Sequence, residues 1–272
     1  MLYDMHLHSN LSHDAKSTPK KMCETAIKNG LSGIAFSDHC DPHITPLNKM
    51  LEDAKRNHRV YDDMKKEYGD SLLVMSSIEI GDAHDFFEGT QQVAAALPYD
   101  SVIGSVHVMK DAFGKHTPHT QIDFSGFSQD AIDEYLTAYF NALEFIAKKA
   151  DFDILAHLNL PIRYINGKYN MSVNIEKYMP QIKRILSVII DREIALEINT
   201  SEIGKTLNDT LPSMDIAALY KSMGGSLITL GSDAHVADTL GNGLKEARDM
   251  LLQNGITQAC YFKDRNPIFY AL

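Results

Sequence analysis

Apolar residues along this chain gather in short runs, and longer segments of helical periodicity separate most of these runs. Seven runs have the length and residue types of buried strands: residues 2–8, 33–37, 72–80, 101–108, 152–157, 194–200 and 226–231. Helical patterns cover residues 18–30, 47–68, 130–150, 173–190, 212–225 and 243–254. Strands that alternate with helices predict parallel β-α units, and seven such units form either a closed barrel or an open sheet.

Turn and cap residues mark several of the predicted boundaries. Thr18 is expected to cap the first helix, with Pro19 at its first helical position and Gly30 at its end. Pro180 lies inside a helical pattern and is expected to kink or break that helix. A last strand is expected at residues 258–262.

Length and charge limit the classes of function. The chain has 272 residues, which fits one large α/β domain or two small ones. Hydrophobic residues make up 44% and charged residues 23%, so the chain can form a sizeable core. The formal net charge of −10 argues against a nucleic-acid binder, which needs a basic surface. A small anionic substrate remains compatible, because local cations or metal ions reverse the field inside one pocket.

Cysteine usage and the N-terminus indicate the compartment. Cys23, Cys40 and Cys260 are far apart and form no CxxC pair, which is typical of a reducing environment. The first ten residues carry no apolar signal core, and no run of 18 apolar residues occurs. We therefore expect a cytoplasmic protein with no membrane span, and the sequence leaves its oligomeric state open.

Histidine and carboxylate residues recur where the predicted strands end. The strand-end residues are His6, His8, Asp38, His39, Glu79, His107, His157, Asp233 and His235. In a parallel barrel, the C-terminal strand ends converge on one face, where catalytic residues gather. Six of the twelve histidines therefore meet there, and a chance scatter would not follow strand ends. The pattern predicts a multinuclear metal site.

The residue types suit divalent transition metals. Imidazole nitrogens and carboxylate oxygens bind Zn²⁺, Mn²⁺ or Fe²⁺. Side chains alternate along a strand, so His6 and His8 point the same way and reach one ion. This pair is weak evidence alone, but it is strong when other strand-end ligands accompany it.

At these positions the chain resembles the polymerase-and-histidinol-phosphatase (PHP) family of phosphoesterases. The family's first motif, H-x-H-x-x-x-S-x-D, corresponds to residues 6–14, and the second corresponds to residues 37–39. Glu79 and the strand-end His107 match the next positions, and residues 231–235 match the last motif. The resemblance extends from residue 2 to about residue 240, nearly the whole chain.

The resemblance implies a single domain over residues 1–272, a distorted (β/α)₇ TIM-like barrel with its metal site at the C-terminal ends of the strands. It also implies three divalent metal ions (Zn, Mn or Fe), and the sequence leaves open which of them are bound. The implied ligand sets are His6, His8, Glu79 and Asp233; Glu79, His107 and His157, with Glu79 bridging; and Asp14, His39 and His235.

The implied activity is hydrolysis of a small phosphomonoester. Two close cations make a bridging hydroxide available at neutral pH, and we expect it to attack phosphorus directly. Asp233 or His235 would move a proton to or from the reacting oxygens. The segments at residues 103–107, 198–201 and 230–235 are most similar to the branch that hydrolyses L-histidinol phosphate in histidine biosynthesis. Other PHP activities, on phosphodiesters or phosphotyrosine, and a non-catalytic metal-binding module are the alternatives.

Substrate residues are predicted from the segments after the fifth and sixth strands. Arg163 and Lys205 are candidates to bind the phosphate, because arginine and lysine both pair with phosphate oxygens. Glu197 is either a substrate contact or a buried structural carboxylate. Two positions depart from the branch's pattern: Glu202 replaces a glycine, and Asn159 replaces an aspartate.

Other polar residues have simpler interpretations. Asp4 and Asp38 either orient ligating imidazoles or are ordinary polar residues at strand edges. Cys40 has no nearby base, so a packed thiol is expected there. Six histidines away from strand ends are expected to be surface or loop residues: His13, His43, His58, His84, His116 and His119.

Overall fold

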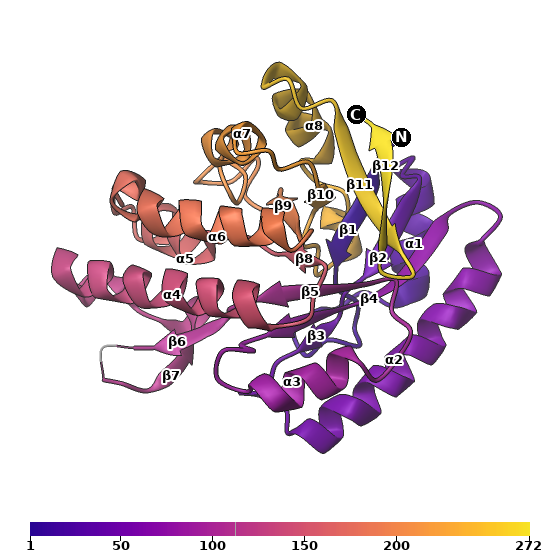
Figure 1. Cartoon of the computed structure of the whole chain (residues 1–272). Helices are drawn as coiled ribbons and strands as arrows, with labels where there is room; N and C mark the ends of the chain where they lie inside the picture. The colour runs from indigo at the N-terminus through magenta and orange to yellow at the C-terminus, as the bar shows by residue number, and fades with distance from the viewer. Residues whose placement is uncertain (112) are drawn as a thin grey trace.

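Seven parallel strands form the centre of the molecule in this computed structural model, which describes residues 1–111 and 113–272 (Figure 1). Neighbouring strands follow the order β1-β2-β4-β5-β8-β9-β10, so each strand pairs with the next one added along the chain. Their bounds are β1 (Tyr3–Leu7), β2 (Gly33–Phe36), β4 (Leu73–Gly81), β5 (Ser101–Ser105), β8 (Ile154–Leu155), β9 (Ala195–Asn199) and β10 (Ile228–Gly231). A short strand, β3 (His39–Cys40), continues the line of β2 along β4.

The first and last strands of this order meet and nearly close the barrel. Leu7 and Ala234 form a parallel bridge, and the His8 amide donates to the Ala234 carbonyl at 2.8 Å. The Asp233 amide donates to the His6 carbonyl at 2.7 Å. These contacts lie at the C-terminal end of β1, so closure brings residues of the predicted metal site together. The expected distorted seven-stranded barrel is confirmed.

Helices cover the outside of the barrel (Figure 1). Their apolar faces form one large core with the outward faces of the strands, and residues such as Leu143 and Leu186 are fully buried in it. The helices are α1 (Pro19–Lys28), α2 (Leu47–Tyr68), α3 (Phe87–Ala94), α4 (Gln129–Lys149), α5 (Leu160–Ile162), α6 (Met179–Asp191), α7 (Met214–Ser222) and α8 (Leu244–Gln253). Among the described residues, no helix combines the length and apolar character needed to cross a membrane.

Local signals predicted some boundaries well and others poorly. Thr18 caps α1 by accepting from the Lys21 amide, as expected. Pro180 does not kink a helix: it lies in the first turn of α6, where its missing N–H costs nothing. The helix predicted from residue 173 therefore begins later, after a 3-10 turn at Ile175–Tyr178.

The strand predicted at residues 101–108 is shorter than expected because the chain leaves the barrel after β5. It forms an antiparallel hairpin of β6 (Val108–Lys110) and β7 (His116–Pro118), which projects beside α4 (Figure 1). Further short helical segments lie at His119–Gln121, Phe124–Gly126, Arg163–Lys168 and Ala237–Thr239.

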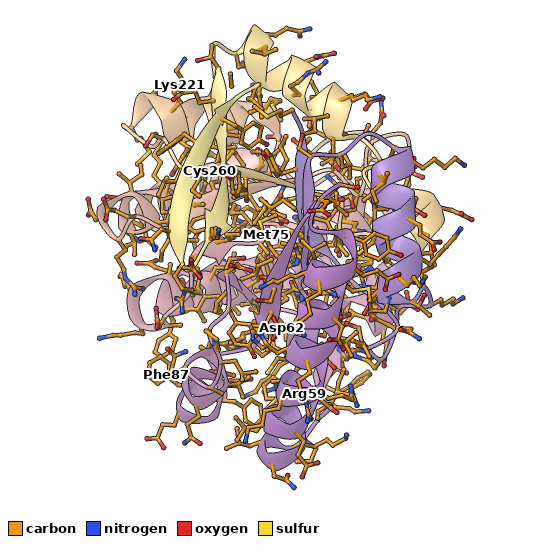
Figure 2. All side chains as sticks on the ribbon, turned by 90° about the vertical axis from the view of Figure 1, so that its right-hand side faces the viewer. Arg59, Asp62, Met75, Phe87, Lys221 and Cys260 are labelled. Atoms are coloured by element: carbon orange, nitrogen blue, oxygen red, sulfur yellow. The ribbon has the colours of Figure 1, made fainter. Side chains whose placement is uncertain are left out.

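An antiparallel hairpin closes the N-terminal end of the barrel. It consists of β11 (Gln258–Lys263) and β12 (Asn266–Ala271), the yellow strands in Figure 2, where Cys260 is labelled. Cys260 and Phe262 pack with Met75 and other apolar residues from inside the barrel in a second buried cluster. The predicted last strand is therefore present, but it does not join the barrel sheet.

Candidate metal centre

Glu79 lies at the middle of the C-terminal face. It is the seventh residue of β4, and its side chain is fully buried. Its Oε1 lies 3.0 Å from Nε2 of both His107 and His157. Its Oε2 lies 2.9 Å from His39 Nδ1 and 3.4 Å from His6 Nε2. One carboxylate thus approaches imidazoles that lie in β1 and β3 and just after β5 and β8.

The His6-Leu7-His8 pair lies beside Glu79 and Asp233. The two Nε2 atoms of His6 and His8 are 3.1 Å apart, and His8 Nε2 is 3.4 Å from Asp233 Oδ1. Asp233 has a positive φ of 53°, which is uncommon for a residue with a side chain. Such backbone strain gathers at functional sites where the surrounding structure holds it in place.

A third group lies nearer the solvent. Asp14 Oδ2 is 3.5 Å from His39 Nε2 and 3.3 Å from His235 Nε2. The Asp14 side chain is 42% exposed, whereas His6 and His8 are buried, so this group lies at the outer side of the centre. The structure therefore brings together all nine residues that the resemblance implies as ligands.

The donor atoms fit bound cations better than they fit one another. His39 Nδ1 and Glu79 Oε2 are 2.9 Å apart, yet both are buried without a hydrogen-bond partner. His157 Nδ1 is also buried and unpaired. Buried polar atoms without partners cost free energy, so their presence indicates a missing ligand. Because His39 approaches both Glu79 and Asp14, the three ligand sets are less separate than the resemblance implies.

The charges of the centre favour cations. Burial raises the pKa of the Glu79 carboxyl, but the positive charges of His107 and His6 outweigh burial and hold that pKa well below its usual value. Burial likewise raises the pKa of Asp233, and the charge of His6 lowers it well below its usual value. Burial lowers the pKa of His6, but the carboxylates of Glu197 and Glu79 raise it well above its usual value. The lowered pKa values keep Glu79 and Asp233 in the ionised form that binds metal, and the raised pKa of His6 shows that its surroundings attract positive charge.

Asp41 is a residue of the centre that the sequence analysis missed. It is buried, and its Oδ1 lies 3.0 Å from His107 Nδ1, so it holds the ring whose other nitrogen faces Glu79. A Cβ atom at Gly81 would come within 2.3 Å of Asp41 Oδ1, so only glycine leaves room for this contact. The signal was available in the sequence, because Asp41 follows His39 by two residues and shares its side of an extended segment.

Glu197 occupies a different place from the expected substrate contact. Its side chain is buried behind His6, with Oε1 2.6 Å from His6 Nδ1, and its Oε2 accepts from the His157 amide at 2.7 Å. It does not line the cavity above the centre. The burial favours the other interpretation, a buried carboxylate that positions its neighbours. A Cβ atom at Gly231 would come within 2.4 Å of Glu197 Oε1, so the strand next to it needs glycine there.

Asp4 and Asp38 accept hydrogen bonds from serine residues in the loops around the centre, and the structure shows no hydrogen bond from either carboxylate to a described imidazole. Asp4 accepts from the amide and hydroxyl of Ser232, and so supports the segment that carries Asp233. Asp38 accepts from Ser9 and from the hydroxyl of Ser12 at 2.7 Å. The Ser12 hydroxyl in turn accepts from the His39 amide at 2.9 Å.

A cavity of about 530 Å³ opens above the nine side chains, and Arg163 lines it. Arg163 Nη1 is 3.7 Å from Asp233 Oδ2, and its Nε is 3.0 Å from Glu202 Oε1. Lys205 lies on the outer side of Glu202, with its side chain 49% exposed, and it does not line the cavity. Of the two expected phosphate-binding cations, the structure places only Arg163 beside the centre.

Other expectations have mixed outcomes. His119 was expected to be a surface or loop residue. It lies in the connection between β7 and α4 but is buried, and its ring bonds to the Val106 carbonyl at 3.0 Å and the Tyr135 hydroxyl at 2.5 Å. Cys40 is a buried thiol packed on Met50, and burial raises its pKa, as expected for an inert cysteine.

Comparisons with known proteins agree with this geometry. The PHP domain family matches residues 4–201. A histidinol-phosphatase of Lactococcus lactis subsp. lactis is 27% identical over 260 residues, which cover 95% of this chain and 93% of the relative. A probable phosphatase of Shewanella frigidimarina is 30% identical over 250 residues, which cover 88% of this chain and 80% of the relative.

A solved structure shares the fold. Histidinol phosphate phosphatase from Lactococcus lactis subsp. lactis, solved in complex with zinc, L-histidinol and phosphate, superposes with a TM-score of 0.80. The alignment covers 98% of each chain at 24% sequence identity. The family match over most of the chain, together with the barrel and the ligands at its strand ends, shows that this protein belongs to the PHP domain family.

Proposed function

We propose that this protein is a metal-dependent phosphatase that hydrolyses L-histidinol phosphate to L-histidinol and phosphate. The observation that carries the proposal is the convergence of nine histidine and carboxylate side chains, seven of which line one cavity together with Arg163, while His6 and His8 are buried. Relatives named histidinol-phosphatase match nearly the whole chain, and the Lactococcus structure contains both products of that reaction.

The nine side chains would hold divalent cations, with Glu79 shared between ligand sets. Divalent cations bound there lower the pKa of water toward neutrality and neutralise phosphate oxygens during hydrolysis. Glu197 and Asp41 keep the imidazoles of His6 and His107 at fixed orientations through their outer nitrogens.

Arg163 would bind the phosphate oxygens that face away from the metal ligands. Its guanidinium is oriented by Glu202, and its Nη1 points toward Asp233. This arrangement explains how glutamate at position 202 is compatible with phosphate binding, because it fixes the arginine without lining the cavity. Arginine suits this role since its planar donors match phosphate oxygens.

Asp233 is better placed than His235 to move a proton at the leaving oxygen. Asp233 Oδ1 faces His8, while Oδ2 faces Arg163 and the cavity. Both nitrogens of His235 are engaged, with Nδ1 2.9 Å from the Asp233 carbonyl and Nε2 3.3 Å from Asp14. Because Asp233 is ionised, its Oδ2 would first accept a proton from the attacking water and then pass that proton to the leaving oxygen.

The cavity suits a small substrate. Besides the predicted metal ligands, its lining includes the apolar or aromatic Leu160, Tyr164 and Pro118 and the polar Thr120 and Gln121. A volume of about 530 Å³ is within the range of small-molecule sites. A compact phosphomonoester with an imidazole end matches these mixed walls.

A phosphate-release panel tests the proposal. Histidinol phosphate, phosphotyrosine, nucleotides and phosphodiesters are compared at equal concentration with Zn²⁺, Mn²⁺ or Fe²⁺ supplied. We expect histidinol phosphate to give the highest kcat/KM. Good turnover of another phosphoester without histidinol phosphate hydrolysis would overturn the substrate but keep the phosphatase. No release from any substrate by the metal-loaded protein would favour a non-catalytic binding module.

A further inference from the structure

A second group of metal-ligating side chains lies outside the nine-residue centre. It consists of His43, Asp85 and His116, and we call it the hairpin cluster. His43 is in the loop after β3, Asp85 is in the turn between β4 and α3, and His116 begins β7. None of the three lines the cavity above the metal centre. No role in the proposed hydrolysis accounts for them.

The donor atoms of the hairpin cluster form a nearly equilateral triangle. Asp85 Oδ2 is 3.2 Å from His43 Nε2 and 3.1 Å from His116 Nδ1, and the two nitrogens are 3.3 Å apart. Ligands at about 2.0–2.1 Å from one Zn²⁺ ion in tetrahedral geometry are roughly 3.3–3.4 Å from one another. The triangle therefore has the size of one face of a tetrahedral site.

Hydrogen bonding alone explains this triangle poorly. If both imidazoles donate to Asp85 Oδ2, their two N–H groups point at the same atom from 3.3 Å apart, and their dipoles repel. If the two nitrogens pair with each other, their one N–H lies between them and neither has a proton left to donate to Asp85 Oδ2. A cation at the centre of the three atoms satisfies all of them at once.

We propose that His43 Nε2, His116 Nδ1 and Asp85 Oδ2 bind one divalent transition-metal ion of the Zn²⁺ class, separate from the ions of the PHP centre. Two imidazoles and one carboxylate form a ligand set that such ions accept, with the remaining position open to water or to another side chain. His84 Nε2 lies 3.6 Å from Asp85 Oδ2 and is a candidate for that position.

The surroundings prepare these side chains for binding. The Phe86 ring packs edge-on against His43 with centroids 4.8 Å apart, which restricts the imidazole's rotation. Burial lowers the pKa of both His43 and His84, so the neutral form that binds metal is populated at pH 7. His43 thus binds an ion without first losing a proton at a large cost.

An ion at this position would fasten the β6–β7 hairpin to the barrel. His116 belongs to the hairpin, whereas His43 and Asp85 follow β3 and β4. Val108 and Pro118 of the same hairpin line the cavity of the metal centre. The ion would therefore hold one wall of that cavity in place without touching the substrate.

Metal stoichiometry tests the site. His43→Gln and His116→Gln are compared with the wild-type protein after zinc loading and removal of free metal, with ions counted by inductively coupled plasma mass spectrometry. His58→Gln is the matched control, because His58 lies on α2 beside Asp62 and away from both sites. We expect each cluster variant to hold one ion fewer per chain, and the control to equal the wild type. Equal counts in all four folded proteins would overturn the proposal.

A second measurement uses only the wild-type protein, so it does not depend on whether variants fold. Histidine carbethoxylation is mapped by peptide mass spectrometry at increasing zinc, up to saturation. We expect modification of His43 and His116 to fall together by at least about ten-fold at saturation, with His58 unchanged. Unchanged modification of His43 and His116 at saturating zinc would refute the site, whether or not the protein is a histidinol phosphatase.

Discussion

The two ends of the barrel are built from the same strands but contain opposite kinds of side chain. Met75 of β4 lies in the apolar cluster at the N-terminal end, and Glu79 of the same strand lies at the metal centre. β5 and β8 show the same change. Ile103 and Ile154 lie in the apolar cluster, whereas His107 and His157, a few residues later, lie beside Glu79. A few residues along a strand thus separate the apolar end from the chemically active end.

This difference separates stability from function. At the N-terminal end, the β11–β12 hairpin fills the opening with Cys260 and Phe262, and the hairpin's turn is tied down by Arg265, which pairs with Asp153. At the C-terminal end, buried atoms of His39, Glu79 and His157 have no hydrogen-bond partner. Each such atom costs about 1–3 kcal/mol until a ligand satisfies it. The apolar end stabilises a fold whose other end depends on a ligand.

The largest effect is expected from Glu79→Gln, which keeps the side chain's volume but removes the charge shared by four imidazoles. We expect kcat to fall at least about ten-thousand-fold and bound metal to fall with it, because the ligands act as a unit. Turnover and metal content are measured on the same sample. Full metal content with more than about a tenth of normal turnover would contradict the shared-ligand role.

Phe262→Ala probes the opposite end. Phe262 is 1% exposed, so its truncation leaves a cavity, and the free energy of unfolding should fall by about 3–5 kcal/mol. Urea unfolding measures the loss, and kcat/KM of the folded protein should stay near normal. Ile268→Ala on β12 is the control, because Ile268 is 37% exposed and should cost less than about 1 kcal/mol. A large loss of kcat/KM in Phe262→Ala would show that the two ends are coupled.

Glu197→Gln tests whether a residue behind the metal centre positions it. The change weakens the contact to His6 Nδ1, and metal affinity should fall about 10–100-fold. Activity should recover when the metal concentration is raised, which a lost catalytic group would not allow. Metal titrations of the variant and of the exposed control Glu176→Gln supply the comparison. Unchanged metal affinity with lower kcat would point instead to a direct part in the reaction.

The smallest effects are expected from substitutions of the two basic residues near Glu202, and they test which of the two binds phosphate. Arg163→Lys should lower kcat/KM for histidinol phosphate by about 10–100-fold, because lysine cannot form the bidentate hydrogen bonds that arginine makes to phosphate. Lys205→Ala should change it less than about three-fold, since Lys205 is half exposed and outside the cavity. Steady-state kinetics measure both variants. A larger loss in Lys205→Ala than in Arg163→Lys would mean that the loop carrying Lys205 closes over the substrate.

Much of the centre could be predicted because its signals are local. A strand that ends in a candidate metal ligand shows this in a few consecutive residues, as the strands before Glu79 and His157 do, and parallel strands bring their ends together. The start of a helix could also be predicted where an N-cap residue is followed directly by proline, as at Thr18 and Pro19.

The supporting residues were harder to predict because nothing local marks them. Glu197 faces His6 across 191 positions of sequence, and its place behind the imidazole depends on how β9, β10 and β1 close the barrel. The hairpin after β5 also escaped prediction, because its apolar residues continue the strand's pattern while the backbone turns away.

By itself, the sequence determined the alternation of strands and helices, the ligand types and their positions at strand ends, because periodicity and motif spacing are properties of neighbouring residues. The tertiary structure decided which of the predicted metal ligands lie close to one another, and it placed Glu197 behind the centre and Arg163 beside it. It also brought His43, Asp85 and His116 together. These contacts join residues far apart in the chain, and only the closed barrel with its loops sets the distances between them.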